Sequence, residues 1–254
     1  MNGLMLHCGA KKIDEPALRA LPTPVGTNTH IPIAHSHLLD VTRNELKKSN
    51  FEITNQAHGC MTEGNKYFGL LEVRHTHKDY GIVVGLRNSH NKEFASGITV
   101  GDRVFVCDNM AFAGDLDLLL RKHTLNILED LPQLVGGLVN KINQQVHIQD
   151  KRIEYYKDGE LSIQEGNDAL AKMYLNNKPL LGVTNFGKVV EEYNKPDKEQ
   201  HEDFRDKNVW RLRNAVTEVM KGGRVFDLPY VSRFLNKTCD KLSGFNPKEI
   251  AQAA

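Results

Sequence analysis

The stretch DYGIVVGLRNSHNKEFASGITVGDRVFVCDNMAFAGDLDLLLRKHT, residues 79–124, decides the fold. It contains three apolar, β-rich segments, at residues 82–86, 95–100 and 104–107, joined by short polar turns. Binding residues are often found where strands end in loops, so we expect a binding site at this edge of a sheet. The polar side chains that follow these segments are Arg87, Asn88, His90, Lys92, Arg103, Asp108 and Asn109.

The sequence before this stretch predicts further strands, and the sequence after it predicts helices. From residue 51 to 108 the strands are separated by turns too short for crossover helices, which predicts a mainly antiparallel sheet. Steps of three and four from Ile127 onward predict one long helix, about 40 Å from Pro132 to Tyr156. We therefore expect an α+β fold: a mainly antiparallel sheet in the N-terminal half, a long helix packed across it, and a helical C-terminal part.

The N-terminal segment is richer in proline than the rest of the chain. Residues 1–32 contain Pro16, Pro22, Pro24 and Pro32, and proline fixes φ and removes a hydrogen-bond donor. We interpret this segment as an extended arm, followed by a single α+β domain over residues 33–254. Within that domain we expect a short helix at residues 36–48, strands over 51–108 and helices over 115–254.

Composition excludes several classes of protein. The 254 residues are 40% hydrophobic and 26% charged, which indicates a globular chain with a core. The formal net charge of +1 gives no global basic field, so binding to nucleic acid would need local clusters of cations. We find no apolar run near the ~18 residues of a membrane helix and no signal peptide. The four scattered cysteines then indicate reduced thiols and a cytoplasmic protein.

Two His-x-His pairs suggest metal binding, at residues 35–37 and 75–77. On a strand, residues i and i+2 share a face, so both imidazoles of a pair are able to reach one metal ion. The spacing has low specificity in a chain with 11 histidines, and no HExxH or paired CxxC accompanies it. We favour structural histidines here. We likewise expect Cys107 to be a buried thiol and the helix around Trp210 to be partly buried, although its arginines would also suit a nucleic-acid contact.

Several segments together resemble a known family. They are IPIAHSHLLD (31–40), YFGLLEV (67–73), VVGLRNSHNKEFA (83–95), GDRVFVCDNMAFAGD (101–115) and RKHT (121–124), with a weaker match over NVWRLRNAVTEVMKGG (208–223). In these segments the chain resembles the phage/plasmid-like protein family known as domain of unknown function 932. The resemblance implies a protein of phages, plasmids or bacteria, and it assigns no catalytic residue.

A short β-meander followed by a long helix is also similar to the core of phage single-strand annealing proteins of the RecT and Redβ type. By this analogy we expect a non-enzymatic protein that binds or anneals single-stranded nucleic acid. It would act as a homo-oligomer in the cytoplasm of a bacterial host, without a cofactor. The expected nucleic-acid-binding residues are Arg74, Arg87, Asn88, His90, Lys92, Arg103, Arg121 and Lys122.

Two alternatives stay open. The first is a metal-dependent hydrolase or nuclease that uses His75, His77, His90 and Asp108. The second is an interaction protein that inhibits a host or defence factor. In that case the proline-rich arm at residues 12–32, or the charged segment at 197–206, would contact the host protein.

Overall fold

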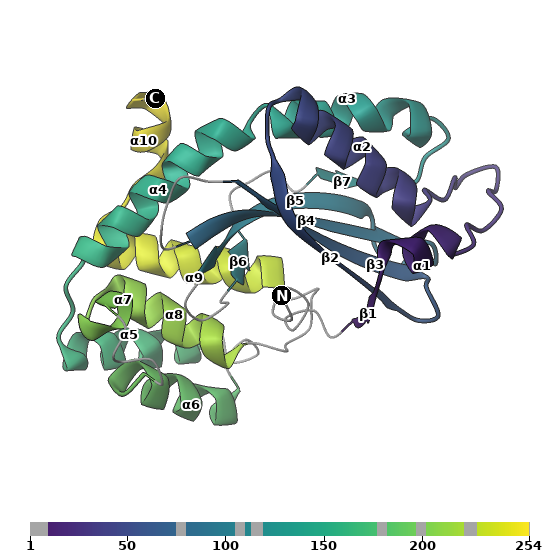
Figure 1. Ribbon diagram of the computed structural model, residues 1–254. Coiled ribbons are helices and arrows are strands. Elements are labelled where there is room, and N and C mark those ends of the chain that lie inside the picture. The colour runs from purple at the N-terminus through teal and green to yellow at the C-terminus, as the bar shows by residue number, and fades with distance from the viewer. Residues whose placement is uncertain are drawn as a thin grey trace. The chain divides into compact units, whose positions relative to one another are not determined.

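The computed structural model describes residues 10–74, 80–104, 110–112, 119–176, 182–196, 202–220 and 228–253 (Figure 1). The chain folds into two compact units. The first contains residues 1–103 and 115–143, and the second contains residues 104–114 and 144–254. The fold is α+β, as predicted, with an antiparallel sheet in the N-terminal half and helices mostly in the C-terminal part.

The first unit is built on an antiparallel sheet. Its strands lie in the order β1 (Lys11–Ile13), β2 (Ile53–Met61), β3 (Lys66–Val73), β4 (Tyr80–Ser89) and β5 (Ser96–Val104), and β7 (Leu119–Arg121) pairs with β5. In the central pair, Lys66 lies opposite Ser89 and Val73 lies opposite Ile82. The register therefore places the start of β3 beside the end of β4.

Two helices, α2 (His35–Lys48) and α3 (Ile127–Val139), lie side by side over one face of this sheet (Figure 1). Both helices have a buried apolar face. Leu38 and Leu39 of α2 and Leu131 and Val135 of α3 are fully buried. The first unit thus has its own hydrophobic core, which stabilises the strand ends where the binding residues were expected.

The arm expected to be extended contains two regular elements. The strand β1 pairs with β2, and the helix α1 (Glu15–Ala20) follows it directly. Asp14 is the N-cap of α1, since its side chain accepts a hydrogen bond of 2.8 Å from the backbone N–H of Ala17. Pro16 lies in the first turn, where proline is tolerated because that N–H has no partner within the helix. The proline-rich composition was misleading here because a proline at this position starts a helix.

The long helix expected to run to Tyr156 is two helices. The first, α3, ends at Val139, and α4 (Ile142–Asp158) begins three residues later. Apolar residues continue at helical spacing across the break, so their period alone does not reveal it. Gly136 and Gly137, in the last turn of α3, have low helix propensity, and the polar pair Asn140 and Lys141 forms the turn after the helix ends.

The second unit consists mainly of helices. They are α4, α5 (Ile163–Asn176), α6 (Val183–Asn194), α7 (Glu202–Arg205), α8 (Val209–Val219), α9 (Leu228–Ser243) and α10 (Pro247–Ala253), with the short strand β6 (Met110–Phe112) beside α9. Among the described helices, none is long and apolar enough to cross a membrane.

The helix that contains the single tryptophan, α8, is a core element of the second unit. Trp210 is fully buried, and the guanidinium of Arg213 lies 5.2 Å from the centre of its ring. The guanidinium of Arg211 is buried as well, and donates hydrogen bonds to the carbonyls of Tyr193, Asn194 and Phe204. Arg211 thus stabilises the ends of α6 and α7. Because both arginines are buried inside the unit, they are not available to bind a nucleic-acid strand.

Candidate functional site

A pocket of about 460 Å³ lies at the strand ends of the first unit. It is lined by three segments: residues 29–30, 92–95 and 122–124. The second segment is the turn between β4 and β5, and the third follows β7. A volume of this size suits a small ligand or one unit of a polymer.

The topology of the sheet explains why these segments meet. Because β7 runs antiparallel to β5, with Arg121 opposite Ser96, residues 122–124 lie next to the turn that leads into β5. The backbone N–H of Ile31 donates a hydrogen bond of 3.1 Å to the carbonyl of His123, which holds the third segment in place. Lys92 adopts a left-handed φ of 63° within the turn, a conformation that residues other than glycine adopt only rarely.

Four histidines lie in and beneath the pocket as two stacked pairs. The rings of His30 and His123 are parallel with centroids 4.8 Å apart, and both residues line the pocket. The rings of His35 and His90 stack at 3.9 Å, and both residues are buried. Flat rings therefore form part of the surface that a ligand would meet.

The hydrogen bonds of Asn88 determine where the protons of His35 lie. Asn88 is fully buried, and its amide nitrogen donates to the carbonyl of Ile33 at 2.7 Å and to Nδ1 of His35 at 2.8 Å. Because Nδ1 of His35 accepts, the proton of this imidazole is on Nε2. That nitrogen lies 2.8 Å from the carbonyl of Gly64, to which it donates.

The same reasoning extends to the pocket through Ser96. The hydroxyl of Ser96 donates its single proton to Oδ1 of Asn88 at 2.5 Å. Ser96 Oγ also lies 2.7 Å from Nε2 of His123, and must accept there, so Nε2 of His123 is protonated. It follows that Nδ1 of His123 is a bare acceptor. This buried atom has no hydrogen-bond partner in the described part of the chain, and neither has Nε2 of His30.

Burial keeps these histidines neutral. It lowers the pKa of His35 and of His123 from the ordinary 6.5 to about 4 in each case. Burial also lowers the pKa of His30 and of His90, with Lys92 adding to the effect at His30. At neutral pH the buried rings are therefore hydrogen-bonding groups and not cations.

The positive charge of the pocket comes from lysines. Lys92 and Lys122 line it from two separate loops, and both are exposed. Phe94 lines the pocket, and the guanidinium of Arg87 lies 5.5 Å from the centre of its ring. Glu93 supplies one carboxylate, which forms an ion pair with Lys66.

The structure brings together about half of the nucleic-acid-binding residues expected from sequence. Lys92 and Lys122 line one pocket, Asn88 and His90 support it from beneath, and Arg87 contacts its aromatic wall. Arg121 instead lies 3.7 Å from Asp130. Arg74 forms an ion pair of 2.7 Å with Glu52, at the opposite end of β3 from the pocket. The side chain of Arg103 lies outside the described residues.

Three of the four residues of the alternative metal site lie outside the described part of the chain. They are His75, His77 and Asp108. His90, the fourth residue of that set, donates from Nε2 to the carbonyl of Ile33 at 2.9 Å. Among the described residues, no group of three or more His, Cys, Asp or Glu side chains is arranged to hold a metal ion.

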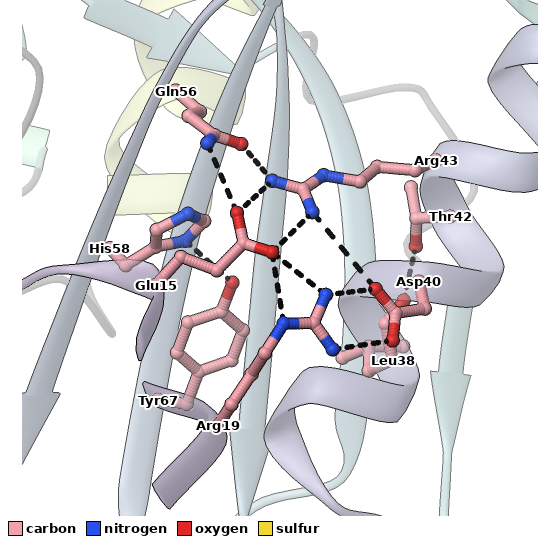
Figure 2. Close-up of polar contacts among 9 residues, drawn as sticks. All are labelled: Glu15, Arg19, Leu38, Asp40, Thr42, Arg43, Gln56, His58 and Tyr67. Atoms are coloured by element: carbon pink, nitrogen blue, oxygen red, sulfur yellow. Dashed lines mark hydrogen bonds and ion pairs between the residues drawn. The ribbon is translucent and has the colours of Figure 1, made fainter. Parts of the chain in front are cut away.

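A second polar cluster fastens α1 to the rest of the first unit (Figure 2). The carboxylate of Glu15 accepts from the two terminal guanidinium nitrogens of Arg43, at 2.8 and 2.7 Å, and from Arg19 at 2.7 Å. Arg19 in turn forms a two-bond pair with Asp40 of α2. Each charge in this cluster has an opposite charge beside it, which indicates a structural role.

Sequence reasoning missed two residues that shape the pocket, His30 and His123. His123 belongs to the RKHT segment, where the two cations drew attention and the histidine did not. His30 lies in the proline-rich arm, and its backbone exchanges hydrogen bonds with Thr27 in a tight turn. Pairing these two histidines from sequence would have required knowledge of a contact across more than ninety positions.

Comparison with protein-family models, curated proteins and solved structures finds no match to this chain. The resemblance to the phage/plasmid-like family accordingly stays a prediction.

Proposed function

We propose that this chain is a non-enzymatic protein that binds or anneals single-stranded nucleic acid, and that the pocket holds one nucleotide of the strand. The observation behind the proposal is the convergence of two exposed lysines, Lys92 and Lys122, on a pocket with aromatic walls. A nucleotide offers both features that such a pocket requires, a negative phosphate and a flat base.

Each part of the pocket suits one part of a nucleotide. The lysines attract phosphate oxygens, which provide most of the affinity of sequence-independent binding. Phe94 and His30, which stacks on the buried His123, offer ring surfaces, and bases stack on such rings with little regard to sequence. Bases are accessible for stacking in single strands, and this favours a single strand over a duplex.

The setting of the proposal follows from the family resemblance. We place the protein on a phage or other mobile element, in the cytoplasm of the bacterial host, as a homo-oligomer. A chain with a net charge of +1 has few cations in excess, so several copies along one strand would supply the phosphate contacts that one copy lacks.

The proposal is tested by fluorescence anisotropy with labelled single-stranded DNA, single-stranded RNA and duplex DNA across a salt series, on protein sized by light scattering. We expect salt-sensitive binding that is tighter for single strands. The double variant Lys92→Ala and Lys122→Ala should bind more weakly, and its log–log salt slope should fall by about 1.4, since each phosphate contact on a single strand contributes about 0.7.

Arg74→Ala is the matched control, because it removes one exposed cation from the same sheet. Arg74 follows β3, and the pocket lies at the other end of that strand, about 25 Å away at about 3.3 Å per residue. It should leave the affinity and the salt slope nearly unchanged. Absence of binding at low salt would contradict the proposal, and equal losses in both variants would remove the pocket from it.

A further inference from the structure

Exposed apolar residues gather along α3, one of the two helices that cover the sheet of the first unit (Figure 1). Leu125, which directly precedes the N-cap of this helix, is 61% exposed, and Leu128 in its first turn is 44% exposed. Pro132 is exposed as well, and it lies one turn beyond Leu128 on the same side of the helix. Grouped apolar residues at a surface are typical of interaction sites.

A groove of about 550 Å³ lies next to these residues, along the seam between α3 and α2. Pro132 lines it from α3, and Val41, Asn44, Glu45, Lys47 and Lys48 line it from α2. Further along the seam, Oε2 of Glu45 lies only 2.9 Å from where a Cβ on Gly136 would be. Glu45 is one turn beyond Val41, and Gly136 is one turn beyond Pro132. The two helices therefore run in the same direction.

The charges on this face have opposite signs at diagonally opposite corners. Glu129 and Asp130 lie in the first turn of α3, and Lys47 and Lys48 lie in the last turn of α2. Glu129 and Lys47 are both exposed, and neither forms an ion pair with another residue that the structure describes. These placements suit the dipoles of the two helices, and they also make the face complementary to a copy of itself.

We propose that this face of α2 and α3 is a contact between two copies of the chain. A two-fold axis in the plane of the face, halfway between the acidic and the basic corner, exchanges the two corners. Glu129 of one copy then faces Lys47 of its partner, and the neighbouring Leu128 lies over the partner's groove. The inference deepens the homo-oligomer of the proposed function and rests on that part of it alone.

The size of the face indicates a weak dimer. Each helix is about 20 Å long and about 10 Å across, so together they present about 400 Å². A stable interface of standard size uses about 800 Å² of each partner, and smaller interfaces are weak or transient. We therefore expect a dissociation constant of about 10–100 µM. Copies bound side by side on one strand have a high local concentration, so a weak contact is sufficient there.

Sedimentation equilibrium of the full chain, without nucleic acid, from about 1 to about 200 µM tests the contact. We expect a monomer at the low end, a dimer at the high end, and weaker association as salt screens the exposed charges. Glu129→Lys and Lys47→Glu should each raise the dissociation constant about tenfold, because each reversal makes two symmetry-related pairs repulsive. The double variant should recover the original value, since it restores both pairs with exchanged signs.

The outcomes separate the contact from the proposed function. A monomer at every concentration overturns the contact, whether or not the chain binds single strands. A dimer that tolerates both single reversals, or that the double variant does not recover, places the contact elsewhere and overturns the inference as well. A protein that dimerises as expected and binds no single strand at low salt overturns the proposed function and leaves the contact standing. Circular dichroism shows whether each variant is folded.

Discussion

The hydroxyl of Ser96 on β5 donates a hydrogen bond of 2.5 Å to the side-chain carbonyl of Asn88 on the neighbouring strand β4. Both residues are buried, and each uses its remaining polar atoms on other groups beneath the pocket. On one side Asn88 orients His35, and on the other side Ser96 orients His123. One contact between strands thus sets the protonation pattern of two histidines.

The variant Ser96→Ala should destabilise the first unit by about 1–3 kcal/mol. It leaves both Oδ1 of Asn88 and Nε2 of His123 buried without this partner, and a buried polar group that loses its partner costs about that much. Urea titration followed by circular dichroism measures the change. Ser49→Ala is the matched control, because Ser49 makes its hydrogen bonds at the end of α2 through its backbone N–H. A loss no larger than that of the control would contradict the hydrogen-bond chain.

The first unit should lose stability as the pH falls from about 6.5 to about 4. Burial lowers the pKa of His35 from 6.5 to about 4, so the unfolded chain binds a proton in this range that the folded chain does not. Stability from this residue is complete above pH 6.5 and is lost progressively below it, by on the order of 3 kcal/mol. His123 acts in the same direction, with the same folded pKa of about 4.

Amide hydrogen exchange of peptides from β3 and β4 at pH 7.5 and pH 5, corrected for the intrinsic rate, measures this loss. His35→Gln should reduce the pH dependence, because it removes one of the titrating groups. His147→Gln, which alters an exposed residue of α4, should not. Equal protection at both pH values would show that the buried histidines are not neutral.

The helix α1 should detach more readily in the variant Glu15→Gln. Glu15 accepts from Arg43 and Arg19 together, and its hydrogen bonds with Arg43 hold its pKa well below the usual range (Figure 2). Since the carboxylate is 25% exposed, we expect a cost of only about 1 kcal/mol, seen as faster proteolysis or hydrogen exchange within residues 10–20. Glu154→Gln removes an exposed pair with Lys151 and is the control. Unchanged exchange of α1 would contradict the assigned role.

Replacing either of two glycines of the second unit with alanine should change the stability of the unit, in opposite directions for the two positions. A Cβ at Gly166 of α5 would collide with the ring of Tyr193, which is almost fully buried, so Gly166→Ala should destabilise. A Cβ at Gly187 of α6 has no atom within 4 Å, so Gly187→Ala should stabilise the helix by about 0.5–1 kcal/mol. Thermal unfolding of both variants measures the two shifts. Shifts of the same sign would mean that the packing of α5 against α6 differs from that described.

Sequence pattern predicted the class of fold because its signals are local. Alternating residues in the strands and the apolar periods of the helices need no knowledge of distant contacts, and the helix expected at residues 36–48 is α2, one residue longer. The break at Asn140 was missed because the apolar period continues through it. The helix α1 was missed because Pro16 was interpreted as a sign of extended chain.

The pocket was less predictable than the fold. Lys92 was expected because it follows an apolar strand, and Lys122 because it belongs to a basic segment. That segment was expected in a region that is helical from residue 115 onward, but residues 119–121 form the strand β7. The convergence of the two lysines depends on the pairing of β7 with β5, which joins segments about twenty-five positions apart. The bare nitrogen of His123 depends on Ser96 of β5 and Asn88 of β4, and single-residue propensities do not encode such a chain of partners.

The division of the chain into units has a consequence for expression and for evolution. Residues 104–114 belong to the second unit although they interrupt the first, so the polypeptide passes between the units three times. A fragment that starts at residue 144 would lack β6, the partner of α9, and a fragment that stops at residue 143 would retain β6 without that partner. No single cut releases an intact half, and gene shuffling would have to transfer both units together.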